Sequence, residues 1–229
     1  MELHIDVSDR LGQVSGILLR PPDAWAIYVL AHGAGAGMRH AFLEAIAESL
    51  ARQGIATLRY QFPYTESGVR RPDPPGVLQA TVRAAVAKAR EIAPDLPLVA
   101  GGKSLGGRMT SNAAAHHPLP GVLGLVFLGF PLHPPKQPGE SRADHLGAVD
   151  LPMLFLQGTR DALAELDLIT AVCGRLGPRA TLHVVEGADH SFAVLKRSGR
   201  NEAEVLEELA LAITDWTRSL VIAEPPRRP

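Results

Sequence analysis

The sequence contains one cysteine, no long apolar run and almost no net charge. The single cysteine, Cys173, excludes an internal disulfide, and because it lies in a segment of helical spacing we expect a buried apolar residue rather than a nucleophile. The longest apolar run, residues 122–130, is too short to cross a bilayer, and residues 1–10 lack the basic and then apolar pattern of a signal peptide. We therefore expect a soluble, cytoplasmic protein that has no membrane partner.

The charges are balanced and dispersed. The chain has 23 Lys and Arg against 24 Asp and Glu among its 229 residues, and its two Arg pairs lie at positions 70–71 and 227–228. Proteins that bind nucleic acids concentrate Lys and Arg on one face, so we expect no nucleic-acid partner. Apolar residues make up 46% of the chain, which is enough for one hydrophobic core. We expect a single domain over residues 1–223 and a disordered tail over residues 224–229.

Eight apolar runs, rich in β-branched residues, alternate with longer segments of helical spacing. The runs cover residues 2–7, 14–20, 26–31, 55–60, 96–100, 122–128, 153–156 and 181–185. Strands that alternate with helices form parallel crossovers, so the pattern predicts an α/β fold. We expect a mostly parallel eight-stranded sheet flanked by helices on both faces, with the first two strands as an antiparallel hairpin. Asn201 and Glu204 have the spacing of a capping box, which predicts the start of the last helix.

A short glycine-flanked motif follows the fifth predicted strand. Residues 102–106 read Gly-Lys-Ser-Leu-Gly and come directly after the apolar run at 96–100. In a nucleophile elbow the serine is held in a strained conformation on a sharp strand-to-helix turn, and glycines two residues to either side avoid collisions of Cβ atoms. Gly102 and Gly106 occupy those two positions, so the motif predicts that the turn presents Ser104 as a nucleophile.

Three polar residues follow predicted strands in the order Ser104, Asp161 and His190. In open α/β sheets the functional residues lie beyond the carboxyl ends of the strands, where these three would meet. A serine hydroxyl is a weak nucleophile unless an imidazole takes its proton, and the imidazole needs a carboxylate to orient it. We interpret Ser104 as the nucleophile, His190 as the general base and Asp161 as the orienting acid. Asp167 is an alternative acid, and we interpret Asp189 as a residue that shapes the loop.

A glycine-rich segment, residues 32–37, follows the third predicted strand. The negative oxygen of a tetrahedral intermediate is stabilised by backbone N–H groups, typically from the residue after the nucleophile and from a loop after an earlier strand. Leu105 and Ala34 are the expected donors. The candidates to line a substrate pocket are His32, Gly33, Gly35, Lys103, Tyr60 and Phe62. A structural role is favoured for the histidine, and packing beneath the loop explains the two aromatic residues equally well.

No cofactor and no metal are expected. The glycine-rich segment lacks the Gly-Lys-Ser/Thr ending of a P-loop and the glycine spacing of a dinucleotide-binding loop. His116 and His117 are adjacent at the end of a predicted helix, and no third ligand has the spacing that would complete a metal site.

Four segments resemble the α/β-hydrolase superfamily: residues 32–37, 62–64, 101–108 and 187–192. They are similar to a small lidless subgroup near the dienelactone hydrolases. They are closer still to the testis-expressed hydrolase-like proteins and to the hydrolase-like domain of a chromatin-acetylation complex subunit. The resemblance implies an eight-stranded sheet whose second strand is antiparallel, and it places a lid, where one exists, between strands six and seven. Only residues 129–151 lie there, so we expect no substantial lid.

The expected activity combines the motifs with this resemblance. Dienelactone hydrolases carry a cysteine nucleophile, whereas this chain has Ser104, so a dienelactone substrate is not expected. We predict a serine hydrolase that cleaves small acyl esters or thioesters through an acyl-enzyme intermediate. Three alternatives stay open: an acyltransferase or perhydrolase that uses another acceptor, a peptidase, and a non-catalytic binding or scaffold module on the same fold. A small acyl compound is the expected partner, and the sequence leaves open whether the chain forms a homo-oligomer.

Overall fold

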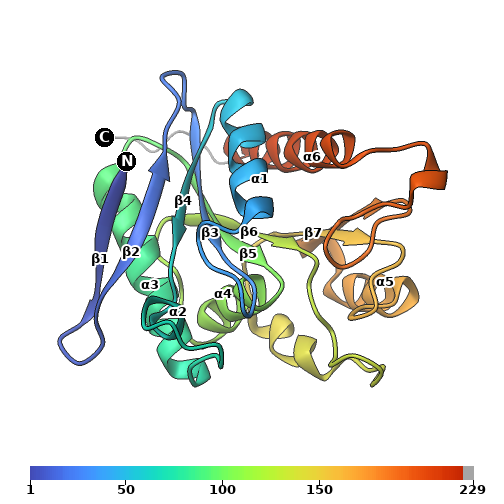
Figure 1. The fold of residues 1–229 in the computed structure, drawn as a ribbon, viewed down its shortest axis with the longest axis horizontal. Helices are drawn as coiled ribbons and strands as arrows, with labels where there is room; N and C mark the ends of the chain where they lie inside the picture. The colour runs from blue at the N-terminus through green and yellow to red at the C-terminus, as the bar shows by residue number, and fades with distance from the viewer. Residues whose placement is uncertain (224–229) are drawn as a thin grey trace.

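The computed structural model describes residues 1–223, and the predicted tail at 224–229 lies outside them. One eight-stranded sheet runs through the described chain, with helices on both of its faces (Figure 1). Its strands are β1 Glu2–Ser8, β2 Gly12–Leu19, β3 Ala26–Ala31, β4 Ile55–Tyr60, β5 Leu98–Lys103, β6 Val122–Leu128, β7 Met153–Gly158 and β8 Ala180–Val185. In space they are ordered β1-β2-β4-β3-β5-β6-β7-β8.

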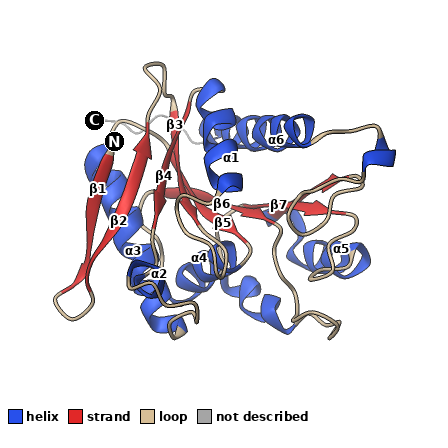
Figure 2. Cartoon of the chain, viewed as in Figure 1, coloured by secondary structure: helices blue, strands red, loops and turns tan. Residues whose placement is uncertain are grey.

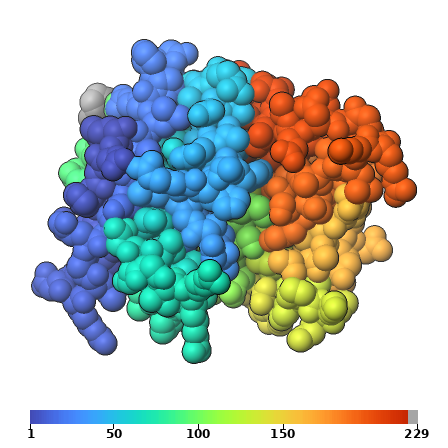
Figure 3. Space-filling view, in the orientation of Figure 1, coloured from blue at the N-terminus to red at the C-terminus, as the bar shows by residue number. Residues whose placement is uncertain are grey.

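The sheet is parallel except at its N-terminal edge. Strands β3 to β8 pair in parallel, whereas β2 is antiparallel to both β1 and β4. The predicted α/β fold, with a mostly parallel sheet and an antiparallel first hairpin, is therefore confirmed. The space-filling view shows the first strands in dark blue at one end of the molecule and the C-terminal part of the described residues in orange and red at the other (Figure 3).

Strand β5 differs from its predicted bounds of 96–100, because it begins at Leu98 and ends at Lys103. Its two glycines, Gly101 and Gly102, continue the parallel pairing with β3 and β6 instead of starting the turn. Glycine is a poor strand former, so a periodicity argument ends the strand too early. The pairing of the neighbouring strands on both sides extends it to the residue before Ser104.

The helices form two layers. On one face lie α1 Ala41–Arg52 and α6 Glu202–Ala223, and on the other lie α3 Pro75–Ile92, α4 Leu105–His116 and α5 Leu166–Leu176 (Figure 2). The remaining turns of helix are α2 Pro63–Glu66 and the 3-10 segments η1 Ser141–Ala148, η2 Gly177–Arg179 and η3 Lys196–Ser198. None of the helices within residues 1–223 is long and apolar enough to cross a membrane.

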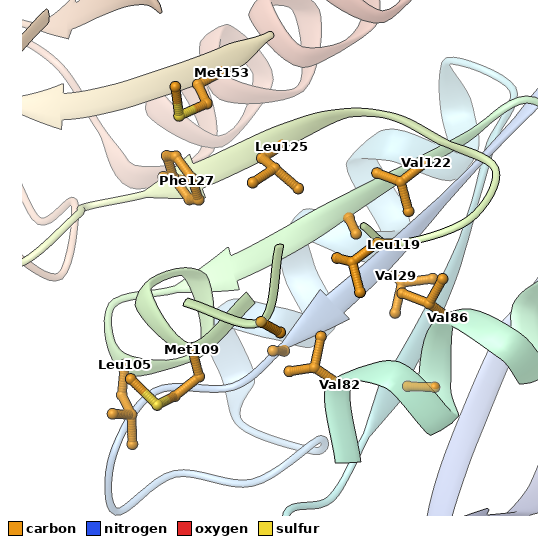
Figure 4. Packing of buried hydrophobic residues seen from close by; sticks show 14 of the residues in the cluster. Val29, Val82, Val86, Leu105, Met109, Leu119, Val122, Leu125, Phe127 and Met153 are labelled. Atoms are coloured by element: carbon orange, nitrogen blue, oxygen red, sulfur yellow. The ribbon is translucent and has the colours of Figure 1, made fainter. Parts of the chain in front are cut away.

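The central strands are buried on both faces, as a parallel sheet between two helical layers requires. All six residues of β3 are buried, and their side chains alternate between the two layers of core. Figure 4 shows part of one layer, where Val82 and Val86 of α3 lie near Val29 of β3, and Phe127 lies near Leu125 of the same strand, β6. This double burial holds the carboxyl ends of the strands in fixed relative positions.

Two local predictions are also confirmed. The N–H of Glu204 donates to the Asn201 side chain at 3.0 Å, and the N–H of Asn201 donates to the Glu204 carboxylate at 2.9 Å, which is the reciprocal pattern of a capping box. Cys173 lies in α5 on the side that faces the core, and burial raises the pKa of its thiol to about 11. The thiol is therefore not a reactive group at neutral pH.

Candidate active site

Ser104 lies on a strained turn between β5 and α4. Its φ is 49° and its ψ is −113°, a combination that residues other than glycine rarely adopt. The turn packs against the end of β3 so closely that a Cβ on Gly102 would lie 2.3 Å from the Ala31 carbonyl oxygen, and one on Gly106 would lie 2.6 Å from the same atom. The Ala31 carbonyl thus leaves no room for a side chain at either position, so both must be glycine. Ser104, which lies between them, is held at the edge of the sheet.

A chain of hydrogen bonds joins the three predicted triad residues. The distance from His190 Nε2 to Ser104 Oγ is 2.9 Å, and the distance from His190 Nδ1 to the nearer Asp161 carboxylate oxygen is 2.7 Å. Because an ionised carboxylate only accepts, the proton of the neutral ring lies on Nδ1 and leaves Nε2 free to accept from the serine hydroxyl. This is the tautomer that lets an imidazole act as a base toward the serine.

The carboxylate of Asp161 is fully enclosed and well satisfied. Its side chain has no exposed surface, and besides His190 it accepts from the side-chain amide of Gln157 at 2.5 Å and from the N–H of Leu163 at 2.8 Å. Gln157 also accepts from the N–H of Phe130 at 3.1 Å, so it links the loop after β6 to the acid. Gln157 was not among the residues predicted from the sequence. Its only signal there is that it is the single amide in an otherwise apolar strand.

His190 lies in a loop whose own hydrogen bonds fix its shape. One carboxylate oxygen of Asp189 accepts from the N–H groups of Ser191 and Ala193, at 2.8 and 3.1 Å, and the backbone of Ala188 pairs with that of Val194. Asp189 therefore shapes the loop, as its position predicts, while the Asp161 side chain reaches the imidazole.

The expected N–H donors lie next to the serine. Leu105 begins α4, and the first N–H groups of a helix have no partner within the helix. The loop after β3 lies against the same turn, since a Cβ on Gly33 would be 3.7 Å from the Ser104 Cβ. Ala34 follows directly and borders the cleft that contains the serine hydroxyl. The positive end of the α4 dipole faces this position, so an anion here is favoured.

A cleft of about 310 Å³ opens beside the triad. Gly33 and Lys103, two of the six predicted pocket residues, line it together with Ala34, Ser104 and His190. Its remaining walls were not predicted and come from the loop after β3, from α1 and from the loops after β7 and β8: Ala36, His40, Phe42, Leu43, Leu163 and Ser191. No short sequence pattern joins these segments, because they meet only when the strand ends come together.

The other predicted pocket residues lie elsewhere. Tyr60 and Phe62 are fully buried beneath the loop and pack edge to face with ring centroids 5.5 Å apart, so neither borders the cleft. Gly35 is exposed at the tip of the loop and does not line the cleft either. For these residues the sequence interpretation as pocket walls is wrong, because the aromatic rings face the core that supports the loop.

His32 is also not a pocket residue. Its ring is fully buried, with Nδ1 2.8 Å from the Gly33 carbonyl and Nε2 accepting from the N–H of Phe62 at 3.2 Å. Burial lowers the pKa of this imidazole to about 4, although the Gly33 carbonyl acts in the opposite direction. The neutral His32 ring therefore connects the loops after β3 and β4 by hydrogen bonds, and it fixes the backbone next to Ala34.

A larger groove of about 780 Å³ lies between β8 and α6, away from the triad. It is bordered by His183 and acidic residues of α6 and contains no serine or cysteine. Across residues 1–223, no three His, Cys, Asp or Glu side chains are grouped so that they could hold a metal ion. Ser104 and His190 border the smaller cleft instead.

Comparison with known proteins agrees with this architecture. A family profile described as "Alpha/beta hydrolase domain" matches residues 24–218. Similar solved structures include a dienelactone hydrolase from Anabaena variabilis, with a TM-score of 0.73 and 23% identity over 96% of this chain and 97% of that one. A serine hydrolase without a lid from Xanthomonas campestris has a TM-score of 0.69 and 18% identity, covering 100% and 96%. An esterase domain from Rhodothermus marinus has a TM-score of 0.71 and 16% identity, covering 96% and 98%.

The close packing of the turn against β3 predicts that a side chain at Gly106 would destabilise the fold. Gly106→Ala should lower the free energy of unfolding by about 1–3 kcal/mol, because its Cβ would meet the Ala31 carbonyl. The matched control is Gly174→Ala within α5, where a Cβ meets nothing within 4 Å, and this change should raise stability by about 0.5–1 kcal/mol. Urea unfolding of the three proteins measures both effects. Equal stability of Gly106→Ala and the wild type would contradict the packing argument.

Proposed function

The chain belongs to the alpha/beta hydrolase family and is a hydrolase, and on that premise we propose that it is a serine hydrolase that cleaves small acyl esters or thioesters. The observation that carries the proposal is the pair of hydrogen bonds at the His190 ring, whose Nδ1 donates to Asp161 and whose Nε2 accepts from Ser104. Each group has the chemistry its role needs: a hydroxyl to attack, an imidazole to take its proton and an enclosed carboxylate to orient the ring.

The first half of the proposed reaction forms an acyl-enzyme. The Ser104 hydroxyl proton passes to His190 Nε2 while Oγ bonds to the carbonyl carbon of the substrate, and the carbonyl oxygen becomes negative. The N–H groups of Leu105 and Ala34 stabilise that oxygen, and loss of one such donor costs on the order of a hundred- to a thousandfold in turnover. The imidazolium then gives its proton to the departing alcohol or thiol as the bond to the carbonyl carbon breaks.

The second half returns the enzyme to its starting state. Water gives a proton to His190 Nε2 and its oxygen bonds to the acyl carbon, which produces a second tetrahedral intermediate at the same N–H groups. The bond to Ser104 breaks, the serine regains the proton from the imidazolium and the carboxylic acid leaves. The Nδ1–H bond to Asp161 is kept throughout, so the carboxylate stabilises the charged ring without taking its proton.

The size and lining of the cleft support a small acyl group. About 310 Å³ suits a short chain or a single ring, and Phe42, Leu43 and Leu163 give it an apolar wall. The segment between β6 and β7 contains only the 3-10 segment η1, so the cleft has no substantial lid to enclose a long substrate. No cofactor takes part in the proposed steps.

Labelling with a fluorophosphonate tests the nucleophile directly. The wild type should gain the mass of one phosphonyl group, because Ser104 Oγ displaces fluoride, whereas Ser104→Ala should gain none. Ser111→Ala is the matched control, since Ser111 also lies beside a histidine, with Oγ 2.7 Å from His145 Nε2, but is fully buried. Intact-mass spectrometry reads all three proteins.

Each outcome separates the proposal from its alternatives. Labelling of the wild type and Ser111→Ala but not Ser104→Ala would support an activated Ser104. Folded wild type without any label would overturn the proposal and favour a binding or scaffold module. If label forms, product analysis with thioesters, peroxide, amines and peptides as competing reactants distinguishes hydrolysis from transfer and from peptide cleavage.

The wall of the cleft predicts a limit on acyl length. Phe42 stacks on Phe192 with ring centroids 5.6 Å apart, and it separates the cleft from a second cavity of about 270 Å³ between α1 and α6. Phe42→Ala should join the two and raise the ratio of kcat/KM for octanoyl over butyryl esters about tenfold, because more methylene groups are buried. Leu195→Ala, outside both cavities, serves as the control and should leave the ratio unchanged. An unchanged ratio in Phe42→Ala would contradict the limit.

A further inference from the structure

Lys103 is the last residue of β5 and directly precedes Ser104, yet its side chain turns toward the loop of His190. Its ammonium donates to the backbone carbonyl of His190 at 2.5 Å. It also lies over the ring of Phe192, 5.4 Å from the centroid, so it contacts the loop at two points. One residue of the turn that presents the serine is thus bonded to the main chain of the residue proposed as its base.

The space for this ammonium is provided by a glycine at the end of β6. A Cβ on Gly129 would lie 3.0 Å from Lys103 Nζ, 3.5 Å from the Asp161 carboxylate and 3.5 Å from His190 Cε1. Gly129 has a φ of 68°, a conformation that suits glycine. The cation, the carboxylate and the imidazole therefore border the same small space, which a side chain at this position would fill.

The charge of Lys103 faces two carboxylates without pairing directly with either. Among the ion pairs of residues 1–223, none involves Lys103. The titratable groups that face it are Asp161 after β7, together with Asp189 and His190 after β8. Asp161 and Asp189 therefore attract the Lys103 ammonium, but its hydrogen bond is made to the His190 backbone carbonyl.

We propose that Lys103 is a positioning residue: its ammonium holds the His190 carbonyl and so fixes the imidazole between Ser104 and Asp161. This inference rests on the proposed serine hydrolase function. Charged hydrogen bonds are about twice as strong as neutral ones, which makes a single ammonium an effective anchor for a loop. The same positive charge opposes the negative charge of Asp161, which the neutral Gln157 amide does not do.

The strength of the hydrogen bond from Lys103 to the His190 carbonyl should depend on pH. Burial lowers the pKa of its ammonium from the ordinary value of 10.5 to about 8, against the opposing attraction of Asp161 and Asp189. Above about pH 8 the group therefore loses its proton, and a neutral amine is a weaker donor to the His190 carbonyl. The anchor is at full strength below that pH and weakens above it.

The test compares the wild type with Lys103→Met, which keeps the length of the side chain and removes the ammonium. We expect the second-order rate of fluorophosphonate labelling at pH 7 to fall about ten- to a hundredfold, because the base is no longer held in position. The wild-type rate should fall above about pH 8, toward that of the variant, and the variant should lack this fall. Lys88→Met, which removes a surface lysine paired with Glu91, is the matched control and should match the wild type throughout.

Stability distinguishes positioning from a merely structural contact. The pKa of Lys103 is lower in the folded chain than in the unfolded chain, so between about pH 8 and 10.5 the unfolded state binds more protons and the wild type gains stability as pH rises. Lys103→Met should lack this gain and should be at least as stable as the wild type at pH 7, while it labels more slowly. Thermal and urea unfolding over this pH range measure both.

Three results would overturn the inference. They are a wild-type labelling rate in folded Lys103→Met, a wild-type profile with no fall above pH 8, and slow labelling explained by a lower melting temperature in the variant. If the variant does not fold, the pH dependence of the wild-type labelling rate still decides the question. A wild type that takes no label at any pH is a different result, because it removes the serine hydrolase function itself and leaves no base for Lys103 to position.

Discussion

The contact between the Ser104 turn and the end of β3 is the constraint on which the rest of the site depends. Helix α4 begins so close to the Ala31 carbonyl that neither Gly102 nor Gly106 has room for a Cβ. That approach holds the serine backbone in its strained conformation and directs the first turn of α4 at the cleft. It also brings the loop after β3 beside the serine, so the proposed nucleophile and the proposed N–H donors are positioned by the same packing.

The other groups of the site are supplied by the loops after β7 and β8. The loop after β7 carries a buried carboxylate that is satisfied by three donors, and the loop after β8 carries an imidazole whose backbone is held by Lys103. A buried negative charge is costly unless it is hydrogen-bonded and opposed by a cation. Asp161 has hydrogen-bond donors and the nearby Lys103 ammonium, so an ionised carboxylate can be buried at the carboxyl edge of the sheet. The neutral His32 ties two of the loops without adding a further charge.

Much of the fold was predictable because its signals are local. Periodicity located all eight strands. Their predicted ends differ most at β5, where the two glycines conceal the end of the strand from a propensity argument. The order of Ser104, Asp161 and His190 after successive strands was also readable, since parallel strands end at one edge of a sheet. Glycines flanking the serine and the Asn201 capping box are motifs of a few residues, and their geometry follows from steric rules that act over a single turn.

What the sequence determined by itself was therefore the class of fold, the position of the turn and the three residues that the strand ends bring together. The tertiary structure alone decided which side chains border the cleft: Phe42, Leu43 and Leu163 line it, whereas Tyr60 and Phe62 support the loop from beneath. It also decided that the Lys103 ammonium points to His190 and that the Gln157 amide joins Phe130 to Asp161. The physical reason is that these contacts join segments far apart in the chain, and their distances depend on strand order and helix packing rather than on any local pattern.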